Sequence, residues 1–563
     1  MDAVATPLVS LQSQFIKTRP SGPIPADILI CGEAPGAEEE VKGVPFVGTS
    51  GAELDRMLHE AGFLRSDCFL TNVCKYRPPE NKIEHFFLDK KQTKPNELIL
   101  EGIAELRDEI RKVRPRLILL MGKTALWAVT GRVGITKWRG SMLEHHYQTP
   151  DGVQHVALLM PTYHPALILR EWGWRSIAIH DLRRAKEALD RGCWPGKEKR
   201  YLVRPSFTDA MDCLGDLIRR ANVRQRQGFP PLPLSNDLET RGGYIACSGY
   251  AWSRTDAICI PNMCVERPTG YFTLDEDVSL WQRERELCTH PHIELVGQNY
   301  LYDAQYTARR RGYVPRLRHD TRLMQHVAWP GLPQGLDFLS SMYAKHHVYW
   351  KDEGKEWNPK IPEDDYWAYN CDDSTSTLEV FFGLERMLRR LGLYDLYRFQ
   401  MRMWWSILRM MLRGIKVDTL RRGEIAGKLM LAAQERQNEL NAILGREFNT
   451  QSFPQMSGLF YGELKCKVVR NKQTRRPTCD EDALKLFAMR EPLLRPIVER
   501  ITEIRAINTL NSNVVQARCP DGRMRSQFSP TAVSFRWTSS KDAFGDGTNL
   551  QNWTKGDEEE EEA

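Results

Sequence analysis

Three features are absent from this sequence of 563 residues. The thirteen cysteines include no Cys-x-x-Cys pair and follow no regular spacing, which is typical of reduced, mostly buried thiols inside a cell. No run approaches the roughly 18 uninterrupted apolar residues of a membrane-spanning helix. The N-terminus lacks the basic-then-apolar pattern of a signal peptide. We therefore expect a cytoplasmic protein with no membrane partner.

A strong charge of one sign is also missing, since the net charge is only +6. This balance neither requires nor excludes nucleic acid, because a large DNA enzyme can confine its positive potential to a groove. The length exceeds what one hydrophobic core supports and indicates three or four domains. Helix breakers and charges at 191–200, and a change to long helical periodicity near 390, indicate boundaries.

Acidic residues gather in three short clusters in the middle of the chain. They are Asp237-Leu-Glu239, the segment that ends in Asp303, and the segment from Tyr369 to Asp373. On a strand, the period of two turns Asp237 and Glu239 to one face. On a helix, the spacing of four puts Tyr369 and Asp373 on one face. Four carboxylates suit two divalent cations about 4 Å apart on a phosphodiester.

Residues 205–390 resemble the 3′–5′ exonuclease domain of family A DNA polymerases, a DnaQ-like nuclease. The resemblance rests on the three clusters together with the segments 233–240, 295–299 and 318–321. It implies two Mg²⁺ or Mn²⁺ ions held by Asp237, Glu239, Asp303 and Asp373. It also implies that Tyr369 positions the attacking water and that Asn299 contacts DNA.

In the N-terminal part, polar residues stand at the ends of expected strands. The apolar runs are 28–32, 68–73, 117–122 and 156–160, and their alternation with helical patterns predicts a mostly parallel three-layer sheet. Asn72 offers a donor and an acceptor that match a pyrimidine edge, and Phe46 can stack on a base. Glu33 can orient water, and His164 can stabilise charge on a departing base.

Residues 20–190 resemble the uracil-DNA glycosylase superfamily, particularly its thermophile-type branch. The matching segments are 32–36 (Gly-Glu-Ala-Pro-Gly), 43–48, 71–79 and 164–170. The resemblance implies a uracil flipped into a pocket that includes Gly32, Phe46 and Asn72, with Glu33 and His164 as catalytic residues. Water would cut the glycosidic bond with no metal in the chemistry.

The cysteines depart from that branch, which carries an iron–sulfur cluster on four of them. No cysteine precedes Cys31, Tyr76 occupies one expected cysteine position, and Cys68 and Cys74 are too few to replace the set. We expect no iron–sulfur cluster. The sequence leaves open whether this domain cuts uracil or only senses it.

The C-terminal part resembles the start of a family A polymerase module. The segments are 413–418, 448–452, 523–532, 536–540 and 548–552. DNA contacts are expected from Arg536, Asn549, Gln551 and Asn552. The palm aspartates and the finger helix of that family lie downstream of 548–552, so this chain is not expected to polymerise alone. It can be half of a split polymerase, a truncated gene product, or a separate repair nuclease with a vestigial thumb.

These observations predict an α/β multidomain protein, part of a phage-type family A DNA polymerase in the host bacterial cytoplasm. The expected domains are an N-terminal extension (1–19), a three-layer α/β/α glycosylase-like domain (20–192), a linker (193–204), a ribonuclease H-like exonuclease domain (205–392), a mostly helical partial polymerase module (393–555) and a disordered acidic tail (556–563). Expected partners are primer–template DNA, single-stranded 3′ ends and a second polypeptide with palm and fingers. The alternative is a non-polymerase repair nuclease or a DNA-binding subunit whose glycosylase-like domain only senses uracil.

Overall fold

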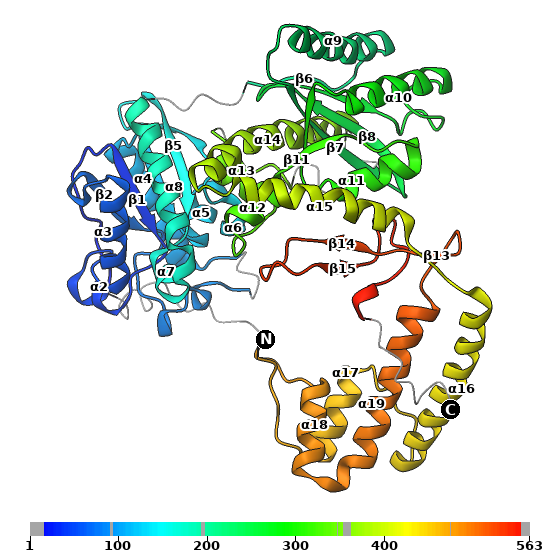
Figure 1. Ribbon diagram of the computed structural model, residues 1–563. Helices are drawn as coiled ribbons and strands as arrows, with labels where there is room; N and C mark the ends of the chain where they lie inside the picture. Colours follow the sequence, from blue (N-terminus) through cyan, green and yellow to red (C-terminus); the bar gives the residue numbers. More distant parts are fainter. Residues whose placement is uncertain are drawn as a thin grey trace. The chain divides into compact units, whose positions relative to one another are not determined.

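The computed structural model describes residues 16–89, 94–192, 198–345, 347–352, 362–472 and 474–552. The chain divides into two compact units (Figure 1). Unit 1 is Met1–Tyr300 with Pro315–Tyr397, and unit 2 is Leu301–Val314 with Arg398–Ala563. The predicted acidic tail, and most of the predicted N-terminal extension, lie outside the described residues. The predicted domain boundaries stay predictions.

The N-terminal half of unit 1 contains a five-stranded sheet in the order β2-β1-β3-β5-β4. Four strands are parallel, as the apolar runs predict: β1 (Ile28–Gly32), β2 (Cys68–Asn72), β3 (Leu117–Met121) and β5 (Gln154–Thr162). The fifth strand, β4 (Leu143–Gln148), was not predicted and pairs antiparallel with β5 at the edge.

Helices cover both faces of this sheet (Figure 1). Because side chains alternate along a strand, Ile28 and Ile30 of β1 face one core and Leu29 faces the other. The first core is closed by α3 (Thr49–Ala61) and α8 (Arg175–Arg191), and the second by α4 (Glu97–Val113) and α5 (Lys123–Thr130). This arrangement confirms the predicted three-layer α/β/α architecture.

The second sheet of unit 1 has six strands in the order β11-β10-β7-β8-β9-β6. An antiparallel meander of β7 (Leu232–Arg241), β8 (Tyr244–Ala251) and β9 (Asp256–Pro261) is extended on one side by the parallel strands β10 (Ile293–Gly297) and β11 (Leu317–Asp320). Counted from β7, the order 3-2-1-4-5 is the ribonuclease H-like topology that the sequence predicts. The added strand β6 (Arg200–Leu202) falls inside the predicted linker and pairs with β9.

Helices pack on this second sheet. The longest, α14 (Glu363–Arg390), lies against β7, β8 and β9, with α12 (Thr321–Ala328) and α13 (Leu336–Tyr343) beside it. The pair α9 (Phe207–Arg226) and α10 (Leu274–Thr289) packs together and reaches β7 and β10. These contacts fix α14 over the strand that carries Asp237 and Glu239.

Unit 2 is mostly helical. Its core gathers around Leu440, Phe460, Phe487 and Ile501. The elements of this part are α15 (Tyr394–Arg413), α16 (Thr419–Leu444), α17 (Phe453–Ser457), α18 (Glu481–Arg490), α19 (Arg495–Leu510), β12 (Ile415–Lys416) with β13 (Arg523–Met524), and β14 (Gln527–Ser529) with β15 (Thr538–Ser540).

Unit 2 also includes a segment from the middle of the sequence, formed by α11 (Leu301–Tyr306) and the π-helical turn Thr307–Arg311. Tyr306 Oη donates a hydrogen bond to the carbonyl of Ala543 (3.2 Å), and its ring lies 4.3 Å from that of Phe544. Arg309 forms an ion pair with Asp542 (3.0 Å) and lies over the Phe544 ring. These contacts join residues more than 230 positions apart.

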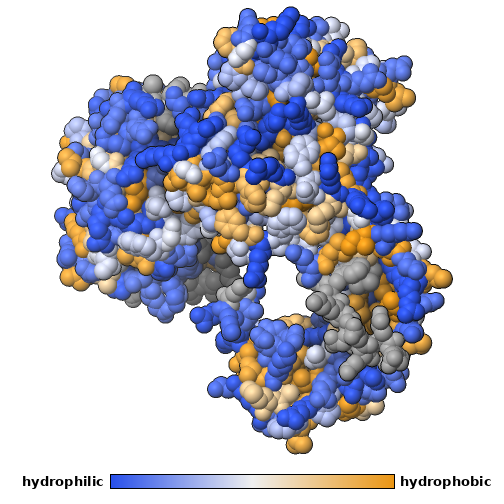
Figure 2. Space-filling view, viewed as in Figure 1, coloured by the Kyte–Doolittle hydropathy of each residue, from blue (hydrophilic) through white to orange (hydrophobic). Residues whose placement is uncertain are grey.

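Within the described ranges, no helix has both the length and the apolar character needed to cross a bilayer. Hydrophilic residues predominate on the face seen in Figure 2, with hydrophobic ones scattered among them. The mixed α/β fold class that the sequence predicts is confirmed.

Candidate active sites

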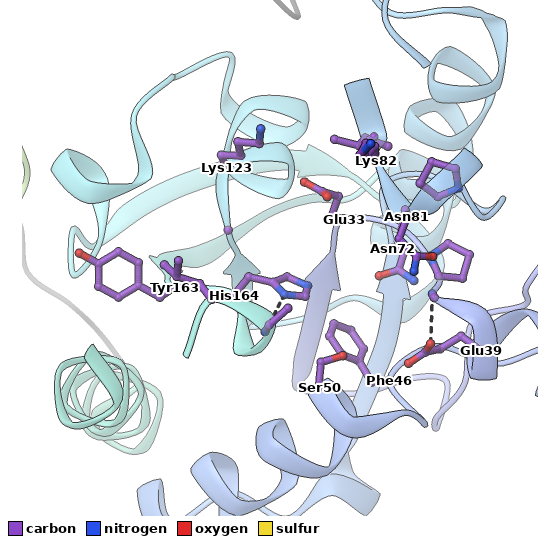
Figure 3. Close-up of a pocket in the computed structure, with 18 of the residues that line it drawn as sticks. Glu33, Glu39, Phe46, Ser50, Asn72, Asn81, Lys82, Lys123, Tyr163 and His164 are labelled. Atoms are coloured by element: carbon purple, nitrogen blue, oxygen red, sulfur yellow. Dashed lines mark hydrogen bonds between the residues drawn. The ribbon is translucent and has the colours of Figure 1, made fainter. Parts of the chain in front are cut away.

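The carboxyl ends of the parallel strands in the first sheet open into one cavity of about 770 Å³. Glu33 directly follows β1, Asn72 ends β2, and His164 comes two residues after β5. Parallel strands present their carboxyl ends at one edge of a sheet, so these side chains converge there (Figure 3). The four predicted residues Glu33, Phe46, Asn72 and His164 all line this cavity.

Phe46 and Asn72 form an almost buried pair in the cavity, with exposed fractions of 5% and 4%. The backbone of Phe46 is left-handed, with φ of 55°, which is strained for a bulky side chain. Its carbonyl accepts a hydrogen bond from Arg65 (2.9 Å), and its ring lies 6.1 Å from the His164 ring. Gly32 leaves room for the Phe46 ring and the Asn72 amide to approach each other.

The protonation state of His164 follows from its contacts. Its Nδ1 accepts a hydrogen bond from the backbone N–H of Ala166 (3.2 Å) at the start of α7 (Pro165–Arg170), so the neutral ring carries its proton on Nε2. Burial and the positive charge of Arg170 lower the pKa of His164 to about 4. His164 is therefore a neutral donor at pH 7. Across the cavity, Glu33 accepts a hydrogen bond from the Thr124 hydroxyl.

Glu39, which the sequence analysis missed, joins the loops around the cavity. This buried carboxylate on α2 (Ala37–Lys42) accepts hydrogen bonds from the backbone N–H groups of Gly36 (3.0 Å), Val47 (3.2 Å) and Gly48 (3.0 Å). It thereby ties the turn after Glu33 to the residues after Phe46. Its position at N3 of a short helix is a capping signal, but nothing local predicts the contacts with Val47 and Gly48.

Three cysteines lie in this domain, and all three are buried. Each thiol donates to a backbone carbonyl: Cys31 to Gly32, Cys68 to Leu64 and Cys74 to Tyr76. Burial raises the pKa of Cys31 and Cys68 to about 12 and that of Cys74 to about 11. Among the described residues, no group of three metal-binding side chains contains a cysteine.

A polar network occupies the region around Tyr76, at one expected cysteine position. Lys17 pairs with Glu101 (2.9 Å) and Glu105, and Tyr76 Oη donates to Glu101 (3.4 Å). Next to it, the buried ammonium of Lys75 pairs with Glu109 (2.7 Å). Side-chain bonds therefore join the segment at 17 and the segment at 75–76 to α4.

In the second sheet, three of the four predicted metal ligands come together. One carboxylate oxygen each from Asp237, Glu239 and Asp373 lies within 4.8 Å of the others. Asp237 and Glu239 extend from one face of β7, and Asp373 reaches them from α14, as the spacing predicts. Three close hard oxygen donors fit a divalent cation.

The electrostatics of this trio reflect crowded carboxylates. Burial, and then the negative charge of Asp373, raise the pKa of Asp237 to about 7, although Asn370 Nδ2 donates to it (2.9 Å). Burial, and then the charges of Asp237 and Asp373, raise the pKa of Glu239 well above its ordinary value. Like charges at this spacing call for a cation to offset them.

Two donors that the sequence analysis missed contact Asp373. Trp350 Nε1 donates to Oδ1 (2.6 Å), and Lys351 Nζ pairs with Oδ2 and also donates to Tyr369 Oη (3.0 Å). Burial alone would lower the pKa of Lys351, but the charges and hydrogen bonds of Asp373 and Tyr369 together outweigh burial, and the pKa is raised. No local pattern around 350–351 signals this contact.

The remaining predicted site residues lie elsewhere. Asp303 is buried on α11, in the segment that belongs to unit 2, and its predicted role as a ligand stays a prediction. Asn299 accepts a hydrogen bond from Arg322 (2.8 Å). In unit 2, Arg536 is exposed, whereas Asn549 and Gln551 are engaged in local hydrogen bonds. The side chain of Asn552 lies outside the described residues.

Comparison with known proteins covers part of the chain. The similarity includes DNA polymerases: the chain is 26% identical over 164 residues to DNA polymerase DpoZ of Vibrio phage phiVC8, which covers 28% of this chain and 26% of that protein. It is 27% identical over 190 residues to DNA polymerase I of Rhizobium leguminosarum, covering 32% and 19% respectively. The chain thus spans about a quarter or less of these two polymerases.

The cavity-bearing domain gives the stronger match. The family model described as the uracil DNA glycosylase superfamily matches residues 20–186, which contain Glu33, Phe46, Asn72 and His164. The type-4 uracil-DNA glycosylase of Saccharolobus solfataricus is 32% identical over 165 residues, covering 29% of this chain and 72% of that protein. On this evidence the chain belongs to the uracil-DNA glycosylase superfamily.

Proposed function

We propose that the chain acts on DNA at two sites: uracil is released in the cavity of the first sheet, and nucleotides are removed from 3′ ends at the carboxylate trio of the second. The first activity depends on one observation above all, the convergence of Glu33, Phe46, Asn72 and His164 on a single cavity.

The cavity has the groups needed to recognise a flipped pyrimidine. The Phe46 ring offers a stacking face, and the Asn72 amide offers a donor and an acceptor for the base edge. Lys82, Lys123 and Arg170 line the cavity and supply positive charge for the phosphates of the strand. Only a base extruded from the helix can enter such an enclosed site.

Glu33 and His164 supply the chemistry. When the glycosidic bond breaks, negative charge develops on the departing uracil, and the neutral His164 can stabilise it by donating its Nε2 proton in a hydrogen bond to a base oxygen. The Glu33 carboxylate, oriented by Thr124, can orient water for attack at the sugar carbon and accept its proton. The domain would do this without an iron–sulfur cluster, because Cys31, Cys68 and Cys74 bond to backbone carbonyls.

The test uses a labelled single-stranded oligonucleotide with one uracil, incubated with the protein in chelator and then treated with hot alkali. A single break at the uracil is expected. Glu33→Ala should slow it by at least about a hundredfold, whereas the exposed Glu144→Ala should not change it. Unchanged release by Glu33→Ala would refute the assignment. An absence of any break in the wild-type protein would leave the domain as a reader of uracil.

The second activity is favoured by the close approach of Asp237, Glu239 and Asp373. These residues would hold a Mg²⁺ or Mn²⁺ ion. When bound, the metal supplies Lewis-acid stabilisation of the reacting oxygens in phosphodiester hydrolysis. On the protein side, the Tyr369 hydroxyl is oriented by Lys351 and can position the attacking water.

Degradation of 3′-end-labelled and 5′-end-labelled single strands, with and without metal, tests this proposal. Asp237→Ala should remove at least about 3 kcal/mol of transition-state stabilisation, a loss of more than about a hundredfold. Asp365→Ala is the matched control, because Asp365 is exposed on α14 and outside the trio. Degradation that survives either chelator or Asp237→Ala would exclude the site.

The similarity to DNA polymerases supports a wider role. The helices of unit 2 would hold primer–template DNA as part of a DNA polymerase. Salt-dependent binding of a primer–template duplex would test the DNA contact. A chain that fails to bind this duplex while degrading single strands would instead be a separate repair nuclease.

A further inference from the structure

A short segment before α14, residues 347–352, places two donors on the nuclease carboxylates. Trp350 Nε1 lies 2.6 Å from Asp373 Oδ1, and Lys351 Nζ pairs with the other oxygen, Oδ2. The same ammonium lies 3.0 Å from Tyr369 Oη and 5.0 Å from the centre of the Tyr369 ring. Lys351 thus contacts at once a proposed metal ligand and the proposed water-positioning phenol.

These bonds are compatible with metal binding. Each carboxylate oxygen has two acceptor sites, so Asp373 can accept from Trp350 and Lys351 and keep a lone pair on each oxygen for a cation. The bond from Lys351 uses a lone pair of the Tyr369 oxygen, and the phenol O–H must then point in another direction. An ammonium donor also polarises the phenol and makes its proton a better donor.

The segment is fixed from both ends by the glycosylase-like domain. The N–H of Met142 donates to the carbonyl of His347 (3.1 Å), and the N–H of Tyr349 donates to Ser141 Oγ (3.1 Å). After Lys351, the carboxylate of Asp352 accepts from Lys137 (2.8 Å). These hydrogen bonds therefore fix the backbone on both sides of Lys351, and its side chain reaches Asp373 and Tyr369.

From these contacts we infer that Lys351 is a positioning residue of the nuclease: it holds the Tyr369 hydroxyl and the Asp373 carboxylate in one arrangement for catalysis. The inference rests on the proposed nuclease function. Lys351 acts through Tyr369 and Asp373 and need not touch the DNA.

The charge of Lys351 gives this role a distinctive signature. The fixed positive charge of Lys351 beside Asp373 opposes the binding of a metal cation there. Removing it in Lys351→Met should tighten Mn²⁺ binding by about threefold or more. The loss of the phenol's orientation should at the same time lower kcat by about tenfold to a hundredfold. A variant with a general structural defect in this site would instead lose both Mn²⁺ binding and catalytic turnover.

The experiment measures Mn²⁺ binding to the full chain, through the electron paramagnetic resonance signal of the free ion, and kcat on a labelled single strand at saturating Mn²⁺. Lys199→Met is the matched control, because Lys199 pairs in the same way with Asp372 (2.8 Å), next to Asp373 but outside the trio. The control should change neither quantity. A second arm combines Lys351→Met with Tyr369→Phe, and the loss in the double variant should be smaller than the two single losses combined.

The outcomes separate the two proposals. Unchanged kcat, weaker Mn²⁺ binding, or additive losses in the double variant would overturn the role of Lys351 while the wild-type nuclease stays active. A wild-type protein without metal-dependent degradation would overturn both proposals. If Lys351→Met does not fold, Lys351→Gln, which keeps an N–H donor without the charge, takes its place. It should also bind Mn²⁺ more tightly, and unchanged binding would refute the charge effect.

Discussion

At the scale of the residue, Gly32 controls how closely the recognition side chains approach each other. A Cβ atom at this position would lie 2.4 Å from Asn72 Oδ1 and 2.5 Å from Phe46 Cζ, well inside van der Waals contact. Any side chain at 32 must therefore push the amide, the ring or both out of place. The glycine is needed for space, and its neighbours Phe46 and Asn72 border the proposed slot for a planar base.

Gly32→Ala should accordingly close the slot. We expect uracil release or uracil binding to fall by about tenfold or more, since overpacking of this kind costs about 1–3 kcal/mol. Rates of base release under single-turnover conditions check this. Gly173→Ala is the control, because nothing lies within 4 Å of a Cβ at that position. Normal release by Gly32→Ala would contradict the packing argument.

Two histidines give the stability of unit 1 a dependence on pH. Burial lowers the pKa of both His164 and His180 to about 4, against 6.5 in an unfolded chain. Between pH 6.5 and 4 the unfolded state binds more protons, so stability falls as the pH falls through this window. At pH 4, the shift of each histidine has lowered the free energy of unfolding by on the order of 3 kcal/mol.

His180→Gln should therefore lose less stability on acidification than the wild-type protein. Because His164 keeps its share, we expect the drop in melting temperature between pH 6.5 and 4 to become smaller rather than vanish. Thermal melts across this range, with both proteins in the same buffers, give the comparison. An identical drop in both proteins would mean that folding does not lower the pKa of His180.

At the scale of the element, the sequence predicts those features that local patterns encode. The buried parallel strands β1 and β3 are apolar runs, and Tyr369 and Asp373 share a face of α14 because they are four apart. Strand β4 was missed because its sequence, Leu-Glu-His-His-Tyr-Gln, is polar at most positions, and it forms only by pairing with β5. Lys351 was missed because its partners come from residues 18 and 22 positions away.

A buried ion pair holds several elements of unit 1 together. Arg139, which follows α6 (Ile135–Trp138), pairs with Asp181 of α8 and also donates to Ser341 of α13 (2.7 Å). The exposed fractions of Arg139 and Asp181 are 1% and 0%. Thr162, at the end of β5, donates to the same carboxylate (2.8 Å).

Arg139→Met should destabilise the protein by about 3–5 kcal/mol, because it leaves Asp181 buried without its cation. The double variant Arg139→Met/Asp181→Leu should recover much of this loss, since it removes both charges. The exposed pair of Arg114 and Asp151 is the control, and its disruption should cost less than about 1 kcal/mol. Denaturant unfolding of unit 1 measures these differences, and a single variant no less stable than the double one would refute the argument.

At the scale of the whole molecule, the two proposed sites belong to separate sheets and use different chemistry. The cavity holds a carboxylate and a neutral histidine, whereas the trio is proposed to hold cations. We expect Glu33→Ala to lose only uracil release and Asp237→Ala to lose only 3′ degradation. Chelator should reproduce the second loss alone. Both activities measured on one substrate with an internal uracil give the test, and a single variant that loses both would show that the sites depend on each other.

The contacts of the segment Leu301–Val314 limit where the gene for such a chain can be split or recombined. Its Tyr306 and Arg309 find partners at 542–544, far beyond the end of the nuclease-like sequence. A break or a recombination joint near 392 would leave the aromatic ring and the guanidinium without these partners. The nuclease-like sequence therefore does not form a self-contained module, and exchange between related genes would have to include the segment around Phe544.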